Sequence, residues 1–106
     1  MMPSFPKEKN YRNPRLLERA KDAPYCMYCR ESNRGQIVAC HSNSQKFGKG
    51  MGQKASDVPI AFLCGHCHSL VDGRIGPHLT QQERDLIFYE AACQTWLLCM
   101  REGWLK

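Results

Sequence analysis

The apolar residues of this chain gather in two short runs and one long mixed run. Residues 36–41 are apolar and partly β-branched and follow a turn at Gly35, so they predict a strand. Residues 58–63 predict a second strand for the same reason. Between them, residues 46–54 alternate glycine with lysine and other polar groups, which indicates a loop.

Two further segments predict helices. Asn13 and Pro14 form a helix start, with Asn13 as the N-cap and Pro14 at the first helical position, where its missing N–H costs nothing. The helix is expected over residues 14–21, with Leu16, Leu17 and Ala20 facing inward. Thr80 and Glu83 form a capping box ahead of a longer helix that reaches about residue 101 and ends at Gly103.

The longer helix carries large side chains at helical spacing. The residues that share one face, with two aromatic residues beside it, are Leu86, Cys93, Leu97 and Met100, with Tyr89 and Trp96. An exposed aromatic residue in this set hints at a homodimer. Cys93 and Cys99 lie about 240° apart on the helix, so they cannot share a metal ion, and we expect both to pack against the core.

The strongest chemical signal is a pair of Cys-x-x-Cys motifs. Cys26 and Cys29 form the first, Cys64 and Cys67 form the second, and 34 residues separate them. Two residues between cysteines let both sulfurs point at one ion, and two such knuckles complete a tetrahedral four-sulfur site for structural Zn²⁺. The second knuckle should open a helix that runs to about Asp72.

Composition restricts the class of protein. A chain of 106 residues is one domain, which we expect at residues 13–106 after a mobile arm at residues 1–12. The seven cysteines are an odd number, which argues against a disulfide framework, although a thiol redox protein stays open. We see no secretory leader and no membrane-spanning run, so a cytoplasmic location is expected. The net charge of +5 favours approach to a polyanion.

Taken in order, these motifs resemble the HNH (ββα-metal) endonuclease superfamily, and within it the YbcO-like nucleases of prophages. The segments that carry the resemblance are residues 13–16, the first knuckle, residues 39–42, residues 48–54, Asp57, and residues 63–72 with the sequence LCGHCHSLVD. The resemblance implies a fold of two strands and a helix wrapped on a metal ion, and a phage or prophage setting.

The resemblance also assigns roles. His41 matches the general base, which takes a proton from water at the end of the first strand. His68 matches the histidine that binds the catalytic ion on the helix, and that ion stabilises the leaving oxygen. Asp57 lies near the place of the central asparagine, where a carboxylate would hold either the ion or the His41 loop. His66 and His78 have no matching role, and His66 is expected to be exposed.

One departure concerns Cys40. HNH enzymes commonly carry Asp or His just before the base as a second metal ligand, and a thiolate is a poor ligand for Mg²⁺. Either Cys40 is a buried strand residue and Asp57 or Asp72 completes the metal site, which we favour, or the preferred ion is not Mg²⁺. The catalytic ion is therefore expected to be Mg²⁺ or Mn²⁺, with Ni²⁺ or Zn²⁺ as alternatives.

Basic residues around these motifs indicate a nucleic-acid surface. Lys46, Lys49 and Lys54 supply charge in the glycine loop, where the backbone can approach a phosphate closely. Arg34 and Arg74 extend this set. The expected partner is nucleic acid, with DNA favoured, and no motif predicts a base-reading helix.

The sequence therefore predicts a small α+β domain: a zinc-stapled ββα-metal core with an N-terminal helix and a longer C-terminal helix. The expected function is metal-dependent hydrolysis of phosphodiesters. The alternative is a non-catalytic zinc module that binds nucleic acid or protein. Cys40 and the absence of the family's central asparagine favour this alternative.

Overall fold

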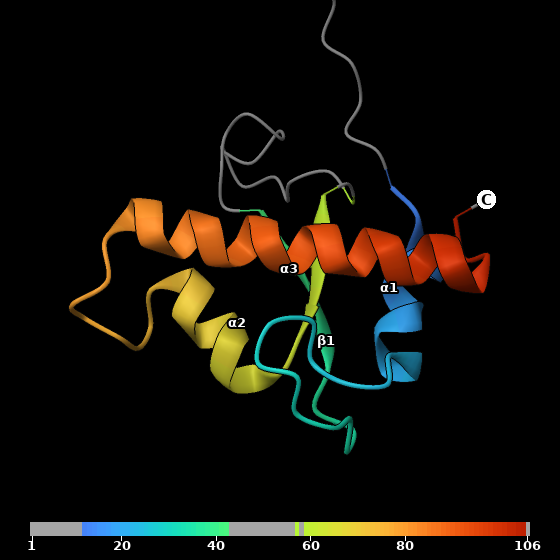
Figure 1. Cartoon of the computed structure of the whole chain (residues 1–106), viewed down its shortest axis with the longest axis horizontal. Helices are drawn as coiled ribbons and strands as arrows, with labels where there is room; N and C mark the ends of the chain where they lie inside the picture. The colour runs from blue at the N-terminus through green and yellow to red at the C-terminus, as the bar shows by residue number, and fades with distance from the viewer. Residues whose placement is uncertain (1–11, 43–56, 58, 106) are drawn as a thin grey trace, which may run out of the picture.

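The fold is a two-stranded sheet with a long helix across it and shorter helices at its sides (Figure 1). The computed structural model describes residues 12–42, 57 and 59–105. Its elements are, in chain order, α1 (Pro14–Glu18), the 3-10 helix η1 (Arg19–Asp22), β1 (Val38–His41), β2 (Ile60–Leu63), α2 (Gly65–Asp72) and α3 (Gln81–Glu102). The chain is therefore α+β, as the sequence predicts.

The sheet joins the two predicted strands in antiparallel register. Val38 pairs with Leu63 and His41 pairs with Ile60, so the end of β1 lies beside the start of β2. All four residues of β2 are buried, because β1 covers one edge and α3 packs against the strand. The continuous apolar run of β2 is what a fully covered strand requires.

The N-terminal helix begins as predicted and ends in a tighter turn. The Asn13 side chain accepts a hydrogen bond from the N–H of Leu16 at 3.1 Å, and Pro14 occupies the first turn. After Glu18 the chain tightens into η1. Leu16 and Ala20 are buried and Leu17 packs against the core, so the inward face is confirmed.

The helix that follows the second knuckle is α2. It ends at Gly73, whose φ of 79° lies in the left-handed region that glycine adopts readily. The buried guanidinium of Arg84, from α3, donates hydrogen bonds to the carbonyl groups of Leu70 and Ile75. This arginine therefore connects α3 to the last turn of α2 and to the segment that follows it.

The long helix α3 has the predicted capping box: the Thr80 side chain accepts from the N–H of Glu83, and the Glu83 side chain accepts from the N–H of Thr80. Its buried face is not the one with the largest apolar side chains. The core side consists of Arg84, Phe88, Ala91, Ala92, Thr95, Leu98 and Cys99. The small residues in this set let the helix approach β2 closely.

The prediction that Cys93 packs against the core is wrong, because Cys93 is exposed; Cys99 is buried, as expected. Both faces of α3 carry apolar groups, so the helical period alone did not identify the inner face. Within the described ranges, no helix has the length and apolar character needed to cross a membrane. The arm at residues 1–11 and the loop lysines Lys46, Lys49 and Lys54 lie outside the described residues.

Candidate functional site

The four cysteines of the two predicted knuckles come together in space. Their sulfur atoms all lie within 4.8 Å of one another, and the Sγ atoms of Cys29 and Cys64 are 3.7 Å apart. Three of the four side chains are buried and Cys29 is exposed at the edge. Four thiols at such separations can hold one tetrahedral metal ion such as Zn²⁺.

The first knuckle is held by backbone hydrogen bonds of its own. The N–H of Cys26 donates to the carbonyl of Glu31 at 2.8 Å, and the N–H of Arg30 donates to the carbonyl of Cys26 at 3.1 Å. The φ of Arg30 is 70°, which turns the chain back immediately after Cys29. Met27 donates to the carbonyl of Phe62, so the knuckle is attached directly to β2.

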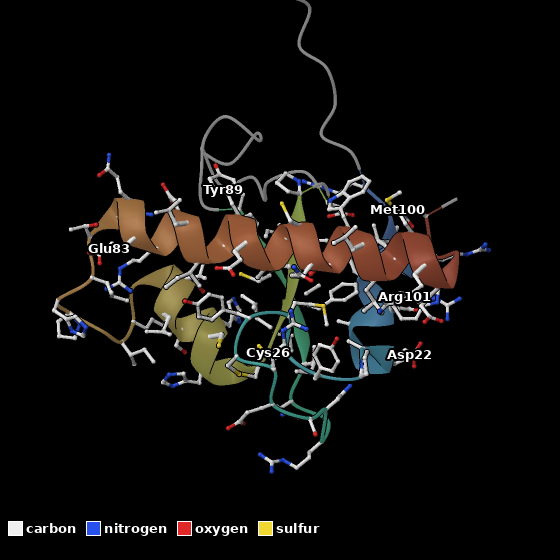
Figure 2. The ribbon with its side chains drawn as sticks, in the orientation of Figure 1. Asp22, Cys26, Glu83, Tyr89, Met100 and Arg101 are labelled. Carbon is white, nitrogen blue, oxygen red and sulfur yellow. The ribbon has the colours of Figure 1, made fainter. Side chains whose placement is uncertain are left out.

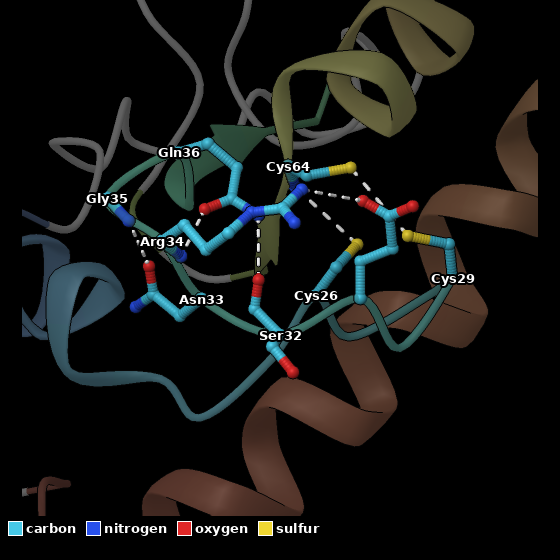
Figure 3. A network of polar contacts seen from close by, with 9 residues as sticks. Cys26, Cys29, Ser32, Asn33, Arg34, Gly35, Gln36 and Cys64 are labelled. Atoms are coloured by element: carbon cyan, nitrogen blue, oxygen red, sulfur yellow. Dashed lines mark hydrogen bonds and ion pairs between the residues drawn. The ribbon is translucent and has the colours of Figure 1, made fainter.

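Two backbone N–H groups donate to the sulfur of Cys26, and Figure 3 shows the one from Cys64. Cys26 Sγ accepts from the N–H of Cys64 at 3.4 Å and from that of Tyr28 at 3.5 Å. Burial raises the pKa of Cys26, but the N–H groups of Cys64, Tyr28 and Cys29 outweigh it and bring the pKa from 9.0 to about 7. The site is therefore arranged to stabilise a thiolate, which is the form that binds metal.

Two other thiols of the cluster have raised pKa values. Burial, followed by the negative charge of Cys26, raises the pKa of Cys67 far above its ordinary value. Burial also raises the pKa of Cys29. Several thiolates cannot share this space without a cation, so a dication would relieve the repulsion that keeps the remaining thiols protonated.

The candidate base His41 forms a pair with Asp57. The Nε2 atom of His41 lies 2.8 Å from Oδ1 of Asp57, whose side chain is buried. The second carboxylate oxygen accepts from the backbone N–H of Asn13, and the guanidinium of Arg12 lies 3.7 Å from Oδ1. Of the two roles considered for Asp57, the geometry matches the one that holds His41.

A second group of potential metal ligands includes Cys40, the residue before His41. Cys40, His68 and Asp72 each offer one ligand atom, and these atoms all lie within 4.8 Å of one another. Cys40 is buried on β1, while the other two residues are one turn apart on α2, with His68 Nε2 3.0 Å from Asp72 Oδ2. Within the described part of the chain, Asp57 does not belong to this group.

The arginines predicted to bind nucleic acid occupy different places. Arg74 lies beside the second group, because its Nη2 is 2.7 Å from Asp72 Oδ2. Arg34 lies in the turn before β1, at the opposite end of the strand from His41, and its Nη2 is 3.6 Å from Glu31 (Figure 3). Both side chains are mostly exposed.

Two features of this region were not disclosed by the sequence. Cys40 is a buried strand residue, as the favoured interpretation expected, but its proximity to the ligand atoms of both His68 and Asp72 appears only in the structure. The contacts of Arg12 and Asn13 with Asp57 span more than 40 positions of the chain, and no local pattern could have disclosed them. His66 is exposed, as expected.

Comparison of the chain with models of protein families, with curated proteins and with solved structures found no match.

Proposed function

We propose that the chain is a metal-dependent endonuclease of the HNH (ββα-metal) type that hydrolyses phosphodiester bonds, with DNA as the expected substrate. The observation that carries the proposal is the adjacency of two clusters on β1. Cys40 belongs to the group with His68 and Asp72, and the next residue, His41, is paired with Asp57. Cys40 and His41 are consecutive residues, so the candidate ion-binding group and the candidate base both involve the end of β1.

In this proposal His41 removes a proton from water. An ionised Asp57 carboxylate only accepts hydrogen bonds, so the Nε2 atom that faces it at 2.8 Å carries the ring hydrogen. Nδ1 is then the unprotonated nitrogen and can take the proton of an attacking water. Asn13 and Arg12 hold the carboxylate from its other sides and thereby keep the imidazole in this orientation.

Cys40, His68 and Asp72 would hold the catalytic ion. A thiolate, an imidazole and a carboxylate together favour a softer divalent ion, Zn²⁺ or Ni²⁺ rather than Mg²⁺. When bound, such an ion supplies Lewis-acid stabilisation to a phosphate and its leaving oxygen. In this proposal Arg74, whose guanidinium contacts Asp72, would bind the same phosphate.

The four-cysteine cluster has a structural role in this proposal. It joins the first knuckle to the start of α2, because Cys64 is the N-cap of that helix and Cys67 lies within it. His68 follows Cys67 directly, so Zn²⁺ at the cluster would fix the first turn of α2 and with it the imidazole of His68. A closed shell of four sulfurs leaves no open position for substrate.

A plasmid-cleavage assay tests the function. The zinc-loaded wild type should convert supercoiled DNA to nicked or linear forms with at least one of Mg²⁺, Mn²⁺, Ni²⁺ and Zn²⁺. His41→Ala should lower the rate by about 10²- to 10⁴-fold, the usual contribution of a general base. His68→Ala should also abolish most of the activity.

His66→Ala is the matched control, because His66 lies on the same helix and is exposed. It should cleave like the wild type. If the wild type and His41→Ala behave alike with all four ions, the endonuclease proposal is wrong, and the non-catalytic zinc module becomes the better interpretation. Single-stranded, branched and RNA substrates in the same assay would define the substrate class.

A further inference from the structure

The outer face of α3 carries an apolar stripe that no described element covers. Leu86, Leu97 and Met100 are 68%, 56% and 64% exposed, and Cys93 is exposed between them. At 100° per residue these four positions fall within an arc of about 60°. In Figure 2 Met100 projects from the edge of α3 that faces away from α1 and α2.

The spacing of the stripe is that of a helix-pairing seam. Leu86, Cys93 and Met100 recur every seven residues, and Leu97 fills the intermediate position. The two ends of this seam are symmetric about Cys93, because Leu86 and Met100 lie at equal distances on either side of it, while Tyr89 is the counterpart of Leu97. A second copy in antiparallel orientation would therefore place Leu86 opposite Met100 of its partner, at both ends of the seam.

Two charges near the ends of the stripe favour the same orientation, although the exposed Glu90 on the same flank would lie near its own copy. Glu83 and Arg101 are 18 residues apart, which is about five full turns, so they lie on the same flank of α3. An antiparallel pair related by a twofold axis brings equal flanks together, so Glu83 lies near Arg101 of the partner. A parallel pair would put these flanks on opposite sides of the seam, where the two residues cannot pair.

We propose that a second copy of this chain docks on the outer face of α3, with the two helices antiparallel and the twofold axis near Cys93. The interface is isologous, so each copy contributes the same residues to it. Its apolar centre consists of Leu86, Cys93, Leu97 and Met100 from both copies, with Glu83 and Arg101 at the rim. The inference is independent of the proposed endonuclease activity, because it uses the face of α3 away from the sheet.

The association is tested by sedimentation equilibrium of the zinc-loaded protein over a range of concentrations. The wild type should dimerise. Leu86→Glu should raise the dissociation constant about 30-fold or more, because it places a charge in the apolar contact at both ends of the seam. Glu102→Gln, on the other side of the helix, should leave it unchanged. Circular dichroism should show the same helix content in all three proteins, because both substitutions lie on exposed positions.

Thiol cross-linking tests the orientation. Cys93 should cross-link to Cys93 of the partner with a short bismaleimide, and Cys93→Ser should lose this product. On the Cys93→Ser background, Leu86→Cys chains should not cross-link to one another, because antiparallel packing separates them by about 21 Å along the helix. A mixture of Leu86→Cys and Met100→Cys chains should cross-link. Glu102→Cys chains on this background measure how much cross-linking arises from random collisions.

Three outcomes would overturn the proposal. A wild type that stays monomeric at all concentrations has no such interface. Cross-linking of Leu86→Cys chains to one another shows a parallel arrangement. A dimer that survives Leu86→Glu with an unchanged dissociation constant uses another surface.

Discussion

The imidazole of His41 and the carboxylate of Asp57 form a pair with a 2.8 Å separation between Nε2 and Oδ1. The carboxylate of Asp57 is buried, while the ring of His41 is partly exposed and accessible to solvent. This is the relationship expected between a base and the group that orients it. Asp57 itself is held by Asn13, the N-cap of α1, which links the start of the domain to the end of β1.

The first prediction follows from that pair. Asp57→Asn should lower the cleavage rate, because an amide can present a donor to Nε2 and thereby favour the tautomer with hydrogen on the catalytic nitrogen. If Asp57 acts through His41, adding Asp57→Asn to His41→Ala should cause little further loss. Rates of the two single variants and the double variant measure this coupling. Independent, multiplicative losses would contradict an orienting role, and melting curves separate it from destabilisation.

The second prediction concerns the identity of the ion that we propose for catalysis. Cys40→Asp replaces a soft thiolate with a hard carboxylate next to His68 and Asp72, so activity with Mg²⁺ or Mn²⁺ should rise relative to activity with Zn²⁺ or Ni²⁺. Cys99→Ser, another buried cysteine far along the chain, is the control for loss of a buried thiol. The same order of metal preference in Cys40→Asp and wild type would remove Cys40 from the ligand set.

Much of the fold could be predicted because its signals are local. Asn13, Thr80 and Glu83 act within one helical turn, and the two Cys-x-x-Cys motifs specify their own turns. The strands were placed correctly but begin later than predicted: β1 starts at Val38, because Gln36 uses its side chain to bind Ser32 and Arg34 in the preceding turn.

The parts that could not be predicted depend on tertiary contacts. The inner face of α3 is set by small residues such as Ala91 that fit against β2, and the larger apolar side chains lie outside. For the site, the sequence supplied the candidate residues but not their partners. Asp57 was favoured, with Asp72, as a ligand of the catalytic ion, whereas in the structure it contacts His41 and only Asp72 belongs to the group with Cys40 and His68.

The third prediction concerns the structural metal. A strong chelator should remove Zn²⁺ from the four cysteines and unfold the domain, since zinc binding contributes about 10–16 kcal/mol in small zinc domains. Cys29→Ser should weaken zinc binding and lower the melting temperature, although Cys29 is the exposed ligand. Cys93→Ser is the matched exposed control and should do neither. An unchanged circular dichroism spectrum after chelation would contradict a structural role for the metal ion.

The fourth prediction gives the sign of the pH dependence of that site. Burial raises the pKa of Cys29 and, more strongly, that of Cys67, so both bind Zn²⁺ only after losing a proton. Zinc affinity should therefore rise as pH increases from 6 to 8, and binding should release protons into the buffer. Calorimetry in buffers of different ionisation enthalpy measures this release. An affinity that does not change with pH would mean that these thiols are not the ligands.

The last prediction tests how α3 is attached to the sheet. Thr95 is buried, accepts a hydrogen bond from the backbone N–H of Phe62 at 3.0 Å, and donates to the carbonyl of Ala91 at 2.8 Å. Thr95→Val keeps the shape but leaves the N–H of Phe62 buried without an acceptor, which should cost about 1–3 kcal/mol of unfolding free energy. Thr95→Ser retains the hydroxyl and loses only a methyl group. Urea unfolding of the zinc-loaded proteins should therefore rank the valine variant below the serine variant, and the reverse order would show that packing of the methyl group, rather than the hydrogen bond, holds α3 on β2.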